Sequence, residues 1–365
     1  MTLQSLNTPA LVVDVARLER NVSGVAGRLG SAGVSLRPHW KTSKCLDVAR
    51  LQLAAGAIGF TCSTPEEVRA LGDAGIRGLV WAHQPVGAAK VGFAVEAVGR
   101  YGTWLIADSV EVARPLSDAL VAAGLVADLL LDVDTGLGRT GVDPDHAVAL
   151  AGAIRGLPGL RLRGVLAHEG HLYGYGADHL GLDAEAGEAS RRLVEVAESL
   201  RAAGHAIDVV SVGSTPGLAA SPYISGVTEA RPGTYVYNDG NQLRLGTCTL
   251  DDCALTVLAR VVSAQRAGTV IIDAGSKAMS SDAVSAENGY GLVLDASGEP
   301  LAGVSFSRAN EEHGFLTGPG TATLAVGDLV RILPHHGCAT VNMWSELVVM
   351  RADGMYERWP IVARH

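Results

Sequence analysis

The sequence WLIADSVEVARPLSDALVAAGLVADLLLDVD, at residues 104–134, contains one strand–helix–strand unit. Residues 104–108 are a short apolar run that ends on an aspartate, and residues 129–134 are a second run that ends in the same way. Between them, residues 110–123 carry apolar side chains at helical spacing. This order predicts a strand, an amphipathic helix and a second strand.

The same alternation repeats from residue 10 to about residue 235. Helical spacing recurs at residues 64–74, 145–154 and 184–203. The apolar runs that predict strands are residues 10–15, 34–39, 57–62, 78–83, 104–108, 129–134, 162–168 and 209–214, with a further candidate at 228–235. Eight or nine strands that alternate with helices predict a (β/α)8 barrel. An open doubly wound sheet is the alternative, but no Gly-x-Gly-x-x-Gly segment follows the first predicted strand.

The pattern changes after about Asn241. Helical periodicity nearly disappears, and Gly, Pro and Asp separate short segments with strand character. These segments are residues 255–262, 268–272, 291–294, 328–333 and 346–350. We therefore predict an α/β protein with two domains, a barrel at residues 10–245 and a mainly β domain at residues 246–365, which residues 1–9 could join.

The composition narrows the classes of ligand and location. A net charge of −9 and the absence of a basic run argue against nucleic acid, so we expect a small-molecule substrate. Gly, Asp or Arg interrupts every apolar stretch before it reaches membrane length, and residues 1–10 lack a signal pattern. We expect no membrane association and a cytoplasmic protein. The five cysteines form no paired framework, so in a reducing compartment any special cysteine is a ligand or a nucleophile.

Polar clusters follow five of the predicted strands. They are residues 38–42 (PHWKT), 132–139 (DVDTGLGR), 168–171 (HEGH), 213–217 (GSTPG) and 231–235 (RPGTY). In a barrel of this kind the chemistry lies at the carboxyl ends of the strands. We therefore expect these clusters to converge on one face.

Lys41 is the candidate nucleophile in the first cluster. The neighbouring cations Arg37 and His39 could lower the pKa of its amine enough for it to act as nucleophile and base. An ordinary surface lysine is the alternative.

The later clusters contain candidate anion ligands. Ser214 and Thr215, in a Gly-rich turn, and Gly233 could donate hydrogen bonds to a phosphate, although tight turns alone would also explain the glycines. Arg139 follows a Gly-x-Gly turn, where a salt bridge with one of the two preceding aspartates is its alternative role.

His336 and Cys338 are the candidate metal ligands. They stand two positions apart after the predicted strand at residues 328–333, and in an extended segment such residues point to the same side. Imidazole with thiolate suits zinc or a similar metal.

Several of these segments carry a resemblance to a known family. Residues 131–141 (LDVDTGLGRTG) resemble the Asp-Thr-Gly-x-x-Arg-x-Gly segment of alanine racemases. Residues 38–42 resemble the Pro-His-x-Lys-Thr motif of the D-serine dehydratase and D-threonine aldolase family. Matching segments continue in order at residues 169–174, 212–216, 231–235, 273–277, 311–314 and 334–338. The chain is identified as a member of this family, which has an alanine-racemase-like barrel and uses pyridoxal 5'-phosphate (PLP).

The resemblance implies a role for each candidate residue. Lys41 would carry PLP as a Schiff base, Arg139 would lie near the ring hydroxyl, and His168 would stack on the ring. Arg231 would face the pyridine nitrogen and keep it unprotonated. The other residues implied in cofactor binding are His39, Ser214, Thr215, Gly233 and Thr234.

The resemblance also implies the reaction. His336 and Cys338 would bind a divalent metal, such as zinc or manganese, that acts on the hydroxyl of a D-3-hydroxy amino acid. We favour dehydration to a 2-keto acid and ammonia, because in this family the His-x-Cys pattern accompanies the dehydratases. The His-x-Asp pattern accompanies the best-known aldolases. The alternative is cleavage to glycine and an aldehyde, as in D-threonine aldolase, with His171 as a candidate base.

Two other classes fit the sequence less well. An amino-acid racemase of this fold needs a tyrosine from its partner subunit and no metal, which His336 and Cys338 argue against. A non-catalytic PLP-binding protein is normally a barrel alone, which the predicted β domain argues against. The resemblance further implies a homodimer.

Overall fold

The computed structural model describes residues 3–176, 178–282 and 289–364. The chain divides into two compact units, which we name the barrel unit and the β unit. The barrel unit contains Ser23–Lys41 and Val48–Gly233. The β unit contains Met1–Val22, Thr42–Asp47 and Thr234–Arg364.

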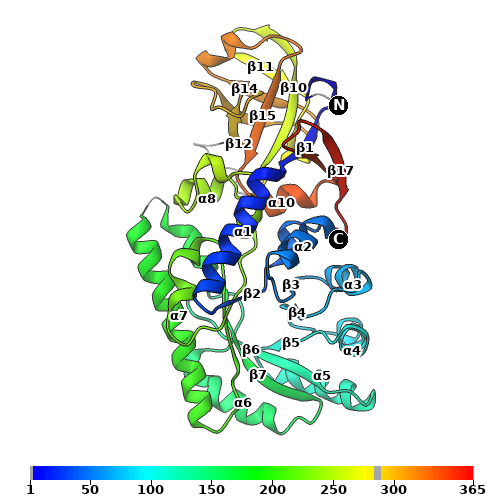
Figure 1. The fold of residues 1–365 in the computed structure, drawn as a ribbon, viewed down its shortest axis with the longest axis vertical. Coiled ribbons are helices and arrows are strands. Elements are labelled where there is room, and N and C mark those ends of the chain that lie inside the picture. Colours follow the sequence, from blue (N-terminus) through cyan, green and yellow to red (C-terminus); the bar gives the residue numbers. More distant parts are fainter. Residues whose placement is uncertain (1–2, 177, 283–288, 365) are drawn as a thin grey trace. The chain divides into compact units, whose positions relative to one another are not determined.

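Eight parallel strands close into a ring in the barrel unit (Figure 1). Hydrogen bonding links six of them in the order β2-β9-β8-β7-β6-β5, and β3 pairs with β4. Two further parallel bridges, His39 to Thr61 and Val80 to Trp104, complete the ring. The strands are β2 (Ser35–Leu36), β3 (Phe60–Cys62), β4 (Leu79–Trp81), β5 (Leu105–Ala107), β6 (Ala127–Asp132), β7 (Leu160–Leu166), β8 (Val209–Val212) and β9 (Glu229–Ala230). The predicted (β/α)8 barrel is confirmed.

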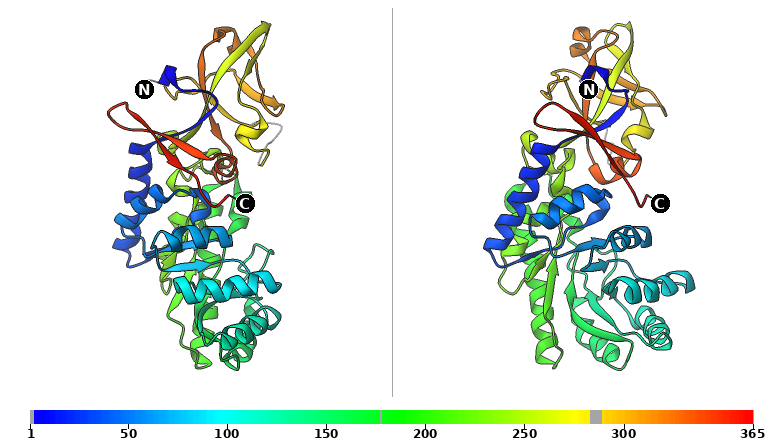
Figure 2. Two further views of the ribbon diagram at one scale, coloured as in Figure 1. Left: turned by 90° about the vertical axis from the view of Figure 1, so that its right-hand side faces the viewer. Right: turned by 45° about the vertical axis from the view of Figure 1, so that its right-hand side comes forward.

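Helices alternate with these strands, as the sequence predicts (Figures 1 and 2). They are α3 (Pro65–Asp73), α4 (Ala88–Tyr101), α5 (Val110–Ala122), α6 (Ala147–Arg155) and α7 (His179–Ala202), while α1 (Val15–Ser31) and α2 (Leu46–Ala54) contain residues of both units. Local signals set the helix starts: at α3, the Thr64 side chain accepts a hydrogen bond from the Glu67 amide, with Pro65 in the first helical position. In the described ranges, none of the helices is both long and apolar enough to cross a bilayer.

The β unit contains a nine-stranded sheet. Its strands are β1 (Ala10–Asp14), β10 (Leu255–Arg266), β11 (Thr269–Ile272), β12 (Gly291–Leu294), β13 (Ser305–Ala309), β14 (Gly314–Thr317), β15 (Leu329–Pro334), β16 (Glu346–Met350) and β17 (Tyr356–Pro360). Each of the five segments that the sequence predicted as strands overlaps one of these strands. Two short helices, α8 (Gly240–Leu245) and α10 (Gly337–Asn342), belong to the same unit, and α9 (Ser276–Met279) adds one further turn.

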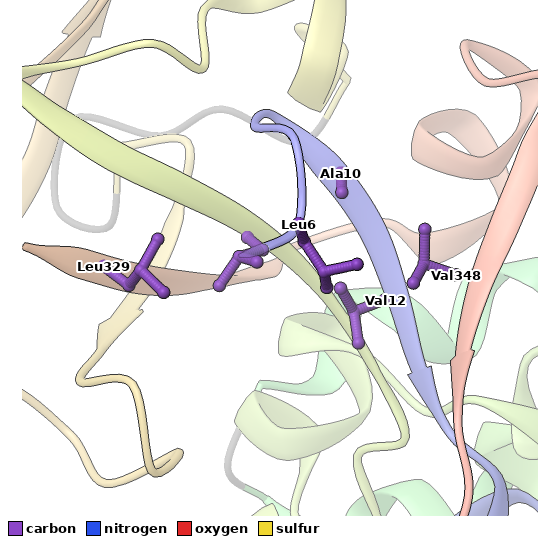
Figure 3. Packing of buried hydrophobic residues seen from close by; sticks show 6 residues of the cluster. Leu6, Ala10, Val12, Leu329 and Val348 are labelled. Carbon is purple, nitrogen blue, oxygen red and sulfur yellow. The ribbon is translucent and has the colours of Figure 1, made fainter. Parts of the chain in front are cut away.

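One predicted barrel strand lies elsewhere. Strand β1, within the run at residues 10–15, pairs antiparallel with β10 and parallel with β16 in the β unit. Its side chains join a core cluster there, shown in Figure 3, with the members Leu6, Ala10, Val12, Leu258, Leu329 and Val348. The expectation that this run is a barrel strand is therefore wrong. A short buried apolar run looks the same in either sheet, because its partners, more than 240 residues away, decide its place.

Candidate active site

Lys41 lies in η2 (Trp40–Thr42), a single helical turn that follows β2. The half-buried His39 precedes it and bridges to Thr61 of the next strand. Burial lowers the pKa of His39 well below its ordinary value, and the charges of Lys41, His168, Arg231 and Arg139 lower it further. Five residues that the sequence singled out thus lie close enough to interact electrostatically.

The geometry fixes the protonation of His168, which follows β7. Its Nδ1 atom lies 2.9 Å from the Gly213 carbonyl oxygen. A carbonyl can only accept, so Nδ1 carries the hydrogen and Nε2 keeps a lone pair. Burial, then the positive charge of Lys41, lower the pKa of His168 to about 3. The imidazole is therefore neutral at physiological pH.

Arg231 follows β9 and is buried. Its guanidinium donates to the Ala167 carbonyl oxygen at 2.6 Å and to the Ser211 hydroxyl at 2.5 Å. Ser211 in turn donates to Glu229, whose other oxygen accepts from Arg37 at 2.8 Å. This chain of bonds fixes the guanidinium in one orientation, while burial lowers its pKa.

Arg139 does not form the salt bridge with a preceding aspartate that was its alternative role. The Asp134 carboxylate accepts hydrogen bonds from three backbone amides of the turn that precedes Arg139. Asp132 accepts from the Gln84 amide and the Thr140 hydroxyl. In the described part of the chain, no ion pair joins Arg139 to either aspartate, and its charge acts on His39 and His168.

The buried Glu169, to which sequence reasoning assigned no role, stabilises the turn after β8. The Ser214 hydroxyl donates to the buried Glu169 at 3.1 Å and accepts from the Gly217 amide at 3.1 Å. Ser190 also donates to Glu169. Burial raises the pKa of this carboxyl against the opposing effect of its hydrogen bonds. The hydroxyl of Ser214 is therefore engaged within the turn, and backbone amides remain as the phosphate donors to be considered.

At Gly213 the backbone of this turn packs closely against the backbone of Arg231. A Cβ atom on Gly213 would lie 2.8 Å from the backbone nitrogen of Arg231 and 3.0 Å from its Cα, so a larger residue would force the strands apart. Thr215 is buried beside Ser214 in the same turn. Gly233 ends the barrel unit, and Thr234 begins the next segment of the β unit.

These residues fit the proposed cofactor chemically. Lys41, Arg139 and Arg231 supply positive charge around two half-buried histidines, and the Nδ1 atom of His39 has no hydrogen-bond partner among the described residues. An anionic cofactor with an aldehyde would match the charge and react with a lysine amine.

His171 lies apart from the cationic group, in η4 (Gly170–Tyr175). Its Nε2 atom is 3.4 Å from Glu185 Oε1, which also accepts from Arg192 at 2.8 Å. The ring packs against Gly136, where a Cβ atom would lie 3.3 Å from it. The ring thus lies within ion-pair distance of Glu185, but among the described residues neither of its nitrogens forms a hydrogen bond.

His336 and Cys338 meet in the β unit, though not through an extended segment. His336 is the N-cap residue of α10, and Cys338 lies in its first turn. Burial acts to lower the pKa of His336, but its hydrogen bonds to Cys338 and Asp282 and the charges of Cys338 and Asp239 raise it to about 10. The imidazole and the sulfur are therefore close enough to bind one ion.

Three further residues contact this pair or the segment between its members, and sequence reasoning assigned no role to any of them. The Asp282 carboxylate contacts His336 Nδ1, which leaves Nε2 for a metal. Asp239 accepts from the Gly337 amide, between the two candidate ligands, at 2.8 Å. Thr42 Oγ1 lies 3.1 Å from the Cys338 sulfur. Among the described residues, no group of three or more His, Cys, Asp or Glu side chains is arranged to hold a metal ion.

Comparisons with known proteins concern the family and the fold of the chain. Residues 13–240 match the model of the alanine racemase N-terminal domain, and residues 254–350 match that of a putative serine dehydratase domain. The chain belongs to the D-serine dehydratase and D-threonine aldolase family. The family predicted from the sequence is confirmed.

Two relatives span almost the whole chain. D-threo-3-hydroxyaspartate dehydratase of Delftia sp. strain HT23 is 38% identical, over 98% of each chain. D-threonine aldolase of an Arthrobacter species is 33% identical, over 99% of this chain and 94% of its own. The solved structure of the Delftia enzyme superposes with a TM-score of 0.93 at 36% identity, over 98% of both chains. Structures of the same enzyme include a His-to-Ala mutant and a metal-free Cys-to-Ala mutant.

Proposed function

We propose that this protein is a PLP- and divalent-metal-dependent lyase that dehydrates D-3-hydroxy amino acids to a 2-keto acid and ammonia. The observation that carries the proposal is that one chain contains both Lys41, among cations and histidines in the barrel unit, and the His336–Cys338 pair in the β unit. The first set suits an amino-acid cofactor, and the second suits a metal that acts on a hydroxyl. Full-length similarity to a D-threo-3-hydroxyaspartate dehydratase supports this reaction.

PLP, when bound, would supply an electron sink for the bond broken at the substrate Cα atom. Lys41 would hold the cofactor by its amine and, once released, would accept the α-proton. Neutral His168, fixed by Gly213, would pack against the ring without adding a charge. Arg231, fixed by Ala167 and Ser211, would face the ring nitrogen and hold it unprotonated. Amides of Ser214 and Thr215, with Gly233 and Thr234, would bind the phosphate.

The metal, when bound, would act as a Lewis acid toward the substrate hydroxyl. His336 would bind it through Nε2, because Asp282 contacts Nδ1. Cys338 would bind as a thiolate. In one metal-free structure of the dehydratase a cysteine is replaced by alanine, and the mutated His and Cys of that enzyme stand two positions apart, as His336 and Cys338 do. Zinc and manganese are the ions that we would test first.

Retro-aldol cleavage to glycine and an aldehyde is the second candidate. The Arthrobacter relative is a D-threonine aldolase, and His171, which lies 3.4 Å from Glu185, offers a base for the hydroxyl proton. Cys338 favours dehydration, since the family resemblance implies aspartate at this position in the best-known aldolases. We further propose a homodimer in the cytoplasm.

A substrate panel tests the proposed function. Purified enzyme is incubated with D-serine, D-threo-3-hydroxyaspartate and their L-counterparts, before and after chelator treatment. We expect keto acid and ammonia from the D-substrates alone, and loss of both products after chelation while PLP stays bound. Equal turnover of the L-substrates, or full activity in metal-free enzyme, would refute the proposal.

A further inference from the structure

Thr42 is a buried residue to which neither the cofactor nor the metal assignment gives a function. It directly follows Lys41 in the chain and belongs, with Cys338, to the β unit. Its side chain is 1% exposed, and its hydroxyl oxygen lies 3.1 Å from the Cys338 sulfur. A second hydroxyl, that of Thr234, lies 3.7 Å from the same sulfur.

The chemistry of a metal-bound cysteine fixes the direction of these contacts. A thiol can donate or accept, but a metal-bound sulfur is a thiolate and can only accept. Both threonine hydroxyls must then donate to it. Such donation withdraws electron density from the sulfur and holds its orientation, as groups around a metal ligand commonly do.

The backbone holds both hydroxyls in place. Two residues after Thr42, the Lys44 amine donates to the Ala363 carbonyl at 2.8 Å, and the Val362 amide donates to the Lys44 carbonyl at 2.8 Å. Thr234 opens η7 (Thr234–Val236), and its carbonyl accepts from the Tyr237 and Asn238 amides. Neither hydroxyl is on a free loop, so their positions beside the sulfur are built into the β unit.

We propose that Thr42 is a positioning residue of the metal site, whose hydroxyl donates to the Cys338 thiolate, with Thr234 as a second and weaker donor. This inference rests on the proposed function, because it takes Cys338 as a metal ligand. It assigns to the residue after the cofactor lysine a role in setting the affinity and electronic character of the metal site.

The test uses the PLP-loaded enzyme with Co2+ as the bound metal. The difference spectrum between Co2+- and Zn2+-loaded samples removes the cofactor's absorbance and leaves the thiolate-to-cobalt charge-transfer band. Thr42→Val keeps the shape and removes the hydroxyl, so the metal dissociation constant should rise about tenfold. The band should move to lower energy, because the sulfur electrons are no longer stabilised. Thr42→Ser, which keeps a donor, should restore both values toward wild type.

Different results would contradict the role of the threonine hydroxyls and the metal site on which that role depends. Thr234→Val should shift the band in the same direction by less, which provides a second readout if Thr42→Val is poorly folded. An unchanged band and metal affinity in either well-folded valine variant at its full Co2+ loading would overturn the role of that hydroxyl. Absence of the band in wild type, or its persistence in Cys338→Ala, would instead refute the metal site and the inference with it.

Discussion

Lys41 is one of four lysines in the chain, with Lys44, Lys90 and Lys277. If it carries the cofactor, borohydride reduction should fix PLP covalently to the peptide that contains it. Peptide mass spectrometry should therefore find the pyridoxyl label on Lys41, and Lys41→Ala should lose the reducible absorbance. Label on one of the other three lysines would exclude the assignment.

His168 predicts a pH dependence of stability. Its folded-state pKa of about 3 lies below the ordinary value, so the unfolded chain takes up this proton first as the pH falls. The stability is complete above about pH 6.5 and is lost as the pH falls toward 3, by about 2 kcal/mol at pH 5. The free energy of unfolding should fall between pH 8 and pH 5 by about 2 kcal/mol less in His168→Gln than in the wild type. An unchanged pH dependence would contradict a buried neutral imidazole.

At the scale of elements, Asp239 joins the start of α8 to the segment of the candidate metal ligands. Its carboxylate accepts from the Gln242 amide, as the helix cap, and from the Gly337 amide. Asp239→Ala should lower the free energy of unfolding by about 2 to 4 kcal/mol, because a cap is lost and a buried amide is left without its acceptor.

Asp178→Ala provides the matched control for this variant. Asp178 caps α7 through the Gly181 amide at 3.0 Å, but it is exposed. Its loss should cost about 1 kcal/mol. Denaturant unfolding measures both variants, and equal costs would show that the contact of Asp239 with Gly337 adds nothing.

The elements also show what the sequence could predict. Apolar runs and helical spacing were sufficient for the barrel strands, because each strand is local and ends on a polar cluster. They failed for β1, whose partners β10 and β16 are far away in the chain. The same limit applies to the site, where Lys41, Thr42 and Cys338 stand in recognisable motifs. The contact between Thr42 and Cys338, and the contacts of Asp239 and Asp282, exist only once the chain has folded.

At the scale of the whole molecule, the two units carry different parts of the proposed chemistry. Lys41 and its buried neighbours belong to the barrel unit, and His336 with Cys338 to the β unit. The cofactor and the metal would serve either reaction of the family equally, so the bond that breaks is the central claim. Elimination removes the substrate hydroxyl, whereas aldol cleavage breaks the Cα–Cβ bond.

The products from D-threonine distinguish these two outcomes in one measurement. The same substrate gives 2-oxobutyrate and ammonia by dehydration, but glycine and acetaldehyde by cleavage. Quantifying all four compounds after incubation with metal- and PLP-loaded enzyme should show 2-oxobutyrate and ammonia in equal amounts, with glycine near background. Glycine and acetaldehyde as the main products would contradict dehydration and establish the aldolase reaction instead.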